Sequence, residues 1–167
     1  MKRPRSTTLL AVVGAALLLA SSISLVGAAS QQALVVNLTL TGDQEVVGTT
    51  CAPPTVCGDP DAVGHARIQI VPALDRVCFR LSWSGIDGTV WGSHIHGPAT
   101  RTQAAGILVP LFMRDPTMPS THLAGTDAIS GCVTGAAADA IAANPGMYYV
   151  NVHSTTYNPG AIRSQLD

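Results

Sequence analysis

Hydrophobic and polar residues alternate along most of the chain, with the period of two that is typical of half-buried β-strands. Between Leu34 and Thr41, for example, Val36, Leu38 and Leu40 share one face. Stretches rich in Gly, Pro and Asp separate these segments and indicate loops. We expect strands at Leu34–Thr41, Ala66–Val71, Val77–Trp83, Trp91–His96, Gly106–Phe112, Ala128–Val133, Met147–His153 and Ala161–Leu166.

One segment departs from this alternation and predicts a helix. Residues 136–143 are rich in Ala, and Asn144, Pro145 and Gly146, which follow directly, are strong signals for the end of a helix. Seven or eight short strands with one brief helix predict an all-β fold. We therefore expect an antiparallel, Greek-key-like sandwich or barrel with one short helix near 136–143.

The first 29 residues have the order of a secretory signal peptide. Lys2, Arg3 and Arg5 precede an uncharged apolar run at 9–20, and small residues follow at 27–29. The apolar stretch is nearly long enough to cross a bilayer, so an uncleaved anchor is the alternative. We prefer cleavage, which leaves residues 30–167 as one domain without stable membrane insertion. The domain is then secreted or extracytoplasmic, in a periplasm or at a cell surface.

Removal of this segment changes the charge of the chain. The remainder carries six Arg against ten Asp and Glu, and therefore a formal charge of −4. A net negative surface offers no electrostatic footprint for nucleic acid or anionic lipid. We therefore expect no nucleic-acid partner.

The four cysteines all lie in the exported part. An even number of cysteines in an oxidising compartment favours disulfides over free thiols. Cys51 and Cys57 bracket a Pro-rich stretch, and Cys78 and Cys132 lie on or beside two expected strands. We prefer the pairs Cys51–Cys57 and Cys78–Cys132, although four cysteines allow three pairings. A four-thiolate zinc site is the rival, and the spacing does not fit its usual paired C-x-x-C pattern.

Two blocks of the sequence resemble a known family. Residues 92–99 read G-S-H-I-H-G-P-A, residues 146–154 read G-M-Y-Y-V-N-V-H-S, and residues 157–166 read Y-N-P-G-A-I-R-S-Q-L. These blocks are similar to those of the CHRD (chordin-type) domain, and the likeness spans roughly 34–166. Ala161 stands where the family usually has Glu, and Ser164 where it usually has Gly. Any role of that Glu is therefore absent here.

The resemblance implies an exported module but does not identify a partner. In animal chordin such domains form part of a secreted growth-factor antagonist, and bacteria carry them as single exported domains. A shared fold does not fix function, so growth-factor binding is not transferred to this chain. The interpretation that we prefer is a non-enzymatic binding or structural module, whose partner is an unidentified protein or extracellular ligand.

Three histidines carry the chemical interest of the sequence. His94 and His96 are separated by one residue on an expected strand, so both side chains leave the same face. His153 lies on another strand, on the face opposite to Val150 and Val152. If the valines face the core, all three histidines lie on the outer face of the sheet. Three imidazoles on adjacent strands could then ligate one ion at about 2.0–2.1 Å, and nitrogen ligands suit copper or zinc.

Two readings of these histidines stay open. In the first, His94, His96 and His153 hold copper or zinc, and the pattern resembles locally the copper site of copper–zinc superoxide dismutase. That comparison needs a fourth ligand, for which His65 and His122 are the remaining candidates. In the second reading, the rings only hydrogen-bond backbone carbonyls or Asn151 and tie a loop to the sheet. Arg163 is expected to pair with a nearby carboxylate.

Overall fold

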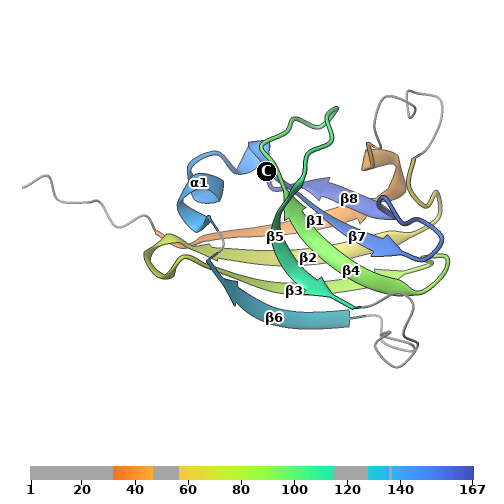
Figure 1. The fold of residues 1–167 in the computed structure, drawn as a ribbon, viewed down its shortest axis with the longest axis horizontal. Coiled ribbons are helices and arrows are strands. Elements are labelled where there is room, and N and C mark those ends of the chain that lie inside the picture. Colours follow the sequence, from red (N-terminus) through yellow and green to blue (C-terminus); the bar gives the residue numbers. More distant parts are fainter. Residues whose placement is uncertain (1–31, 47–56, 115–127, 136) are drawn as a thin grey trace, which may run out of the picture.

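The computed structural model describes residues 32–46, 57–114, 128–135 and 137–167 (Figure 1). These residues form one antiparallel sheet of eight strands, one α-helix and three short 3-10 turns. The strands and the helix are β1 (Leu34–Thr41), β2 (Val63–Val71), β3 (Arg76–Ser84), β4 (Val90–His96), β5 (Ile107–Met113), β6 (Ala128–Thr134), α1 (Ala138–Ala143), β7 (Tyr149–Ser154) and β8 (Ile162–Gln165).

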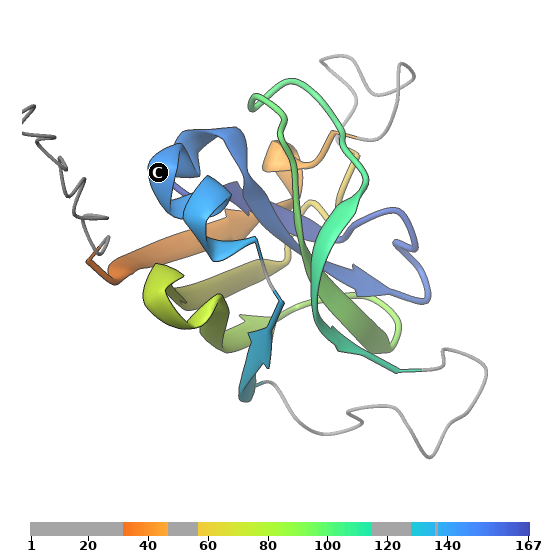
Figure 2. The same ribbon diagram turned by 60° about the vertical axis from the view of Figure 1, so that its left-hand side comes forward.

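The sheet curls into a nearly closed barrel (Figures 1 and 2). Its strand order is β5-β4-β7-β8-β1-β2-β3-β6, so the last strand of the chain lies in the middle, between β7 and β1. The two end strands, β5 and β6, are in contact but form no ladder with each other. Inside the barrel the rings of Trp83 and Phe112 stack, with 6.3 Å between their centroids. The expected all-β fold is confirmed, and its form is a barrel.

The interior of the barrel is apolar because the alternation of each strand points one face inward. On β3, Val77, Phe79 and Leu81 are buried, and Ile68 and Ile70 face them from β2. Burying one such side chain completely stabilises the fold by about 1.5–3 kcal/mol. The helix α1 lies at one end of the barrel and contributes to the same core. Hydrophobic burial therefore fixes which face of β1, β2 and β3 meets the solvent.

Most expected elements lie within a few residues of their observed positions. The first strand has the predicted bounds, and β2 begins at Val63, three residues before the expected start. The strand β7 begins at Tyr149 because Pro145–Met147 forms a 3-10 turn instead of extended chain. The helix occupies Ala138–Ala143, inside the predicted 136–143.

One predicted disulfide is confirmed. Cys78 on β3 is directly opposite Cys132 on β6, and the two are bonded. Cys57 is also disulfide-bonded. Its expected partner, Cys51, lies outside the described residues, so that pairing stays a prediction.

The expected signal segment, 1–29, also lies outside the described residues. Within the part of the chain that the structure describes, no helix is long and apolar enough to cross a membrane.

The Cys78–Cys132 bond makes a direct prediction about stability. It closes a loop of 54 residues, and a loop of that length restricts the unfolded chain by about 4 kcal/mol. The double variant C78S/C132S should lose about 2–4 kcal/mol in the free energy of unfolding, measured by urea denaturation. The single variant S130A, on the same face of β6, is the control and should change little. An unchanged midpoint in the double variant would contradict the prediction.

Candidate metal centre

The three histidines lie on two adjacent strands, β4 and β7. Their antiparallel register places His94 opposite Asn151 and His153 opposite Gly92. His94 and His153 therefore sit at neighbouring positions on one face, with His96 two residues further along β4. A Cβ at Gly92 would lie 3.6 Å from Nε2 of His94, an ordinary van der Waals contact, so this position borders the histidine pair without crowding it.

This face is the outer side of the sheet, as the sequence predicted. Ile95 and Val150 belong to the apolar core, and the histidines leave the strands on the opposite side. The rings are nevertheless buried, with exposed fractions of 0% for His94, 7% for His96 and 5% for His153. Loops that fold over the outer face provide the cover, which the strand pattern alone did not predict.

The first covering loop joins β4 to β5, at residues 97–106. Nδ1 of His96 donates a hydrogen bond to the carbonyl oxygen of Ala105 at 2.9 Å. The ring of Tyr149 stacks flat on that of His96, with centroids 4.8 Å apart, and its hydroxyl donates to the same carbonyl at 3.3 Å. Gly97 lets the loop turn here, because it has a φ of +146° and a Cβ would lie 2.4 Å from the ring of Tyr148. The loop is thus held against the histidine face by direct contacts.

Arg163 on β8 anchors the same loop, mainly through backbone carbonyls. Its guanidinium lies 3.4 Å from the centroid of the Tyr149 ring. It donates to the carbonyl oxygens of Thr100 and Gln103 at 3.0 and 3.1 Å. Among the described residues it forms no ion pair with a carboxylate. Carbonyl oxygens of the loop are its direct partners, while the nearby carboxylate, that of Glu45, attracts it without an ion-pair contact.

Hydrogen bonds determine where the imidazole protons lie. Nδ1 of His153 is 2.8 Å from the carbonyl oxygen of Asn158, which can only accept, so Nδ1 carries the proton. In the neutral ring Nε2 then accepts from Nδ1 of His94, 2.9 Å away. Nε2 of His94 is left with a lone pair, and it is buried without a hydrogen-bond partner among the described residues. A buried nitrogen without a hydrogen-bond partner destabilises the folded state. Among the ring nitrogens of the cluster, Nε2 of His94 is the one in this position.

Burial also sets the charge of the cluster. The pKa of His94 falls to about 3, mainly through burial and also through the positive charges that His153 and His96 would carry. The pKa of His153 falls to about 4, mainly through burial, although its bond to Asn158 opposes the shift. Burial lowers the pKa of His96 as well. All three rings are therefore neutral at pH 7, which is the form that ligates metals.

The geometry is close to that of a three-nitrogen metal site. One ring nitrogen from each of the three histidines lies within 4.8 Å of the other two. Bonds of about 2.0–2.1 Å allow at most about 4.2 Å between two ligands of one ion, so the most widely spaced nitrogens would need to approach by at least about half an ångström. The 2.9 Å between His94 and His153 already equals the spacing of ligands at a right angle. An ion in this place substitutes for the proton that those two rings share.

The fourth-ligand candidates are not brought to this place. His65 is exposed on β2, which is separated from β4 by β7, β8 and β1. His122 lies outside the described residues. Among the described residues, His94, His96 and His153 form the one cluster of His, Cys, Asp or Glu with metal-ligand spacing.

Two residues near the site were not predicted from the sequence. The ring of Trp91 lies 5.0 Å from that of His153, because a register shift between Val90 and Gly92 turns Trp91 toward the histidines. Glu45 is buried behind Asn151, and no strand pattern marks it because it follows a 3-10 turn. Bulges and loop contacts give no periodic pattern in the sequence, so the positions of Trp91 and Glu45 near the site could not be predicted from it.

Glu45 is joined to the cluster through Asn151. Burial raises its pKa to about 7, while Arg163, the backbone of Val46 and the side chain of Asn151 oppose the shift. The Asn151 side-chain oxygen also lies 3.1 Å from Nε2 of His96. Gly160 makes room for this carboxyl group, since a Cβ there would lie 2.3 Å from Oε1 of Glu45. The histidines are thus one end of a buried polar layer that continues to Glu45.

The family comparison covers this whole region. The model of the CHRD domain matches residues 36–166. The chain belongs to the CHRD family. No curated protein and no solved structure matches it. The CHRD region contains β2 to β8, most of β1, the three histidines and the loops that cover them, so the candidate centre lies within the family domain.

Glu45 and the histidines have opposite effects on stability as pH changes. The raised pKa of Glu45 stabilises the fold below about pH 4.5, and this contribution is lost as pH rises through 7. The lowered pKa values of His94 and His153 stabilise it above about pH 6.5, and this is lost as pH falls. The variant E45Q removes only the first contribution. Between pH 4.5 and 6.5 its free energy of unfolding should rise with pH more steeply than that of the wild type, by about 1.4 kcal/mol per pH unit.

Urea unfolding of both proteins across this pH range measures the difference. The variant Q44A changes the neighbouring polar residue without removing a carboxyl group and serves as the control. Equal pH slopes for wild type and E45Q would show that Glu45 is ionised in the folded protein.

Proposed function

We propose that this protein is an extracytoplasmic CHRD module that binds one copper or zinc ion through His94, His96 and His153. The observation that carries the proposal is the convergence of three neutral, buried ring nitrogens from two adjacent strands. Nitrogen-only ligation suits copper and zinc, and hard oxygen-seeking ions are disfavoured.

The hydrogen bonds around the rings support ligation. In metal sites, the ring nitrogen that does not bind the metal usually donates to a carbonyl or carboxylate, which fixes the ring. Nδ1 of His96 donates to Ala105 and Nδ1 of His153 donates to Asn158, both backbone carbonyls. Nε2 of His153, which faces Nδ1 of His94 at 2.9 Å, and Nε2 of His96, which lies 3.1 Å from the side-chain oxygen of Asn151, are therefore the nitrogens that would turn to an ion, together with Nδ1 of His94.

Binding is proposed here rather than redox turnover. A superoxide dismutase-like reaction requires the substrate to reach the metal, and the rings of His94, His96 and His153 are almost completely covered. Trp91 adds to this cover above His94 and His153. Holding or carrying an ion needs only occasional opening of the loops, which suits this degree of burial.

Two features of the chain favour a location outside the cytoplasm. The N-terminal segment has the order of a secretory signal, and the Cys78–Cys132 disulfide is typical of an oxidising compartment. The proposed partner is a protein or another extracellular ligand. It binds the domain or accepts the metal ion from it.

A purely structural network is the competing explanation, since most of the ring nitrogens already have partners within the protein. Metal content distinguishes the two. Mature protein purified without an affinity tag should contain close to one copper or zinc ion per chain, or take it up when copper or zinc salt is added. The variants H94Q and H153Q should lose it, and H65A should keep it, because His65 is exposed and remote from the cluster.

A second measurement keeps the proposal testable if the variants are unstable. In the wild type, saturating metal should raise the melting temperature, since an ion that binds only the folded state stabilises it. Copper should also quench part of the tryptophan fluorescence, because Trp91 lies 5.0 Å from the ring of His153. The H65A protein should respond in the same way. Wild type without bound metal and without a thermal response would leave the histidines as a structural network.

A further inference from the structure

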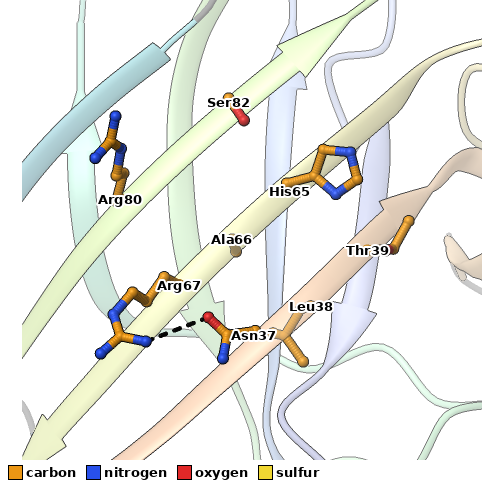
Figure 3. Close-up of a pocket in the computed structure, with 8 residues that line it drawn as sticks. All are labelled: Asn37, Leu38, Thr39, His65, Ala66, Arg67, Arg80 and Ser82. Carbon is orange, nitrogen blue, oxygen red and sulfur yellow. Dashed lines mark hydrogen bonds between the residues drawn. The ribbon is translucent and has the colours of Figure 1, made fainter.

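A second polar surface lies on the opposite part of the barrel, on the outer face of β1, β2 and β3. It is a shallow groove between residues of these three strands, shown in Figure 3. The residues that line it are Asn37, Leu38, Thr39, His65, Ala66, Arg67, Arg80 and Ser82. The side chains of Arg67 and Arg80 are exposed to solvent. The groove is separate from the histidine cluster, since β8 and β7 lie between β1 and β4.

Two arginines occupy paired positions on this outer face, and their guanidinium groups point away from each other (Figure 3). The register pairs Arg67 on β2 directly with Arg80 on β3, and like charges in directly opposite positions destabilise a sheet. The Arg67 side chain leans toward β1, where its Nη1 donates to the side-chain oxygen of Asn37 at 3.4 Å (Figure 3). A cross-strand arginine pair without an acidic partner is an arrangement that an anion would relieve.

No carboxylate neutralises the pair within the described residues. The strands β1, β2, β3 and β6 contain no Asp or Glu. They carry Arg67, Arg76 and Arg80, three of the six arginines of a mature chain whose formal charge is −4. The ion pair that the described residues do form, Arg101 with Asp167, lies elsewhere. Positive charge is therefore concentrated on this one face.

Beside the arginines, the groove offers hydroxyl and amide groups, the imidazole of His65 and the apolar Leu38 and Ala66. Asn37 and Thr39 line it on β1, and Ser82 lines it on β3. In the next row of the sheet, Ser130 of β6 is paired with Arg80. Such side chains exchange hydrogen bonds with sugar hydroxyls, while a guanidinium binds carboxylate or sulfate oxygens in a bidentate manner.

We propose that this groove binds an acidic polysaccharide, with the carboxylate or sulfate groups of the chain held by Arg67 and Arg80. Polar residues on either side of the arginines contact the neighbouring sugar hydroxyls. Nucleic acid is disfavoured because the protein as a whole is negative, and because the groove has no Phe, Tyr or Trp on which a base can stack. Two arginines are also fewer than the basic cluster that typically reads an anionic lipid surface.

The proposal is tested with purified mature protein in a chelator, so that the result does not depend on the histidine cluster. The probes are fluorescently labelled polygalacturonate and dextran sulfate, with uncharged dextran as the neutral polymer. We expect binding to at least one acidic polymer, weakening as sodium chloride is raised, and no binding to dextran. The variants R67Q and R80Q should each weaken binding about tenfold or more, since each removes a charge-assisted contact.

A stability measurement separates this role from a structural one. Because the two arginines repel each other in the free protein, R67Q and R80Q should leave the melting temperature unchanged or raise it. The matched control is R101Q, which removes the same charge from an exposed loop and should bind like the wild type.

Several outcomes would overturn the proposal. They are absence of binding to both acidic polymers, retention of binding in an R67Q/R80Q double variant, and equal weakening by R101Q. Binding of double-stranded DNA or anionic vesicles with the same dependence on Arg67 and Arg80 would show general polyanion adsorption and would overturn it as well.

Discussion

The pairing of β4 with β7 is the constraint on which the rest of the structure depends. It places His94 beside His153 on one side of the sheet and Ile95 beside Val150 on the other. Both sides are buried, since all six residues of β7 and all four of β8 are shielded from solvent. A strand buried on both faces is normally apolar on both. Here one face is apolar and the other is polar. Each nitrogen and oxygen buried on the polar face therefore needs a hydrogen-bond partner within the protein.

Loops supply most of those partners. Backbone carbonyls at Thr100, Gln103, Ala105 and Asn158 accept from the arginine and histidine side chains of the sheet. Their approach requires glycine at 97 and 160, where a Cβ would clash with Tyr148 and Glu45. The loops therefore act as a second layer of the fold, and the two sequence blocks that resemble the family contain both the strands and these loops.

The fold was largely predictable because its core follows a simple period. Val36, Leu38 and Leu40, and likewise Val77, Phe79 and Leu81, mark the inner face by alternation alone. The same rule correctly placed the three histidines on the outer face. It did not predict their burial, because the cover comes from loop residues whose positions have no period. It also missed Trp91, which a bulge redirects, and the backbone carbonyls that hold Arg163, because a pattern of side chains does not show where loop carbonyls lie.

The position of β8 has a consequence for the order in which the molecule is completed. The sheet consists of two parts, β1-β2-β3-β6 and β5-β4-β7, and β8 is the strand that joins them. Its four residues, Ile162–Gln165, follow all the other described strands in the sequence and are synthesised after them. Until they emerge, β1 and β7 each present an unpaired edge, and Arg163 is not yet available to hold the 97–106 loop. Assembly of the barrel, and of the enclosed histidine face, therefore waits until β8 has been synthesised.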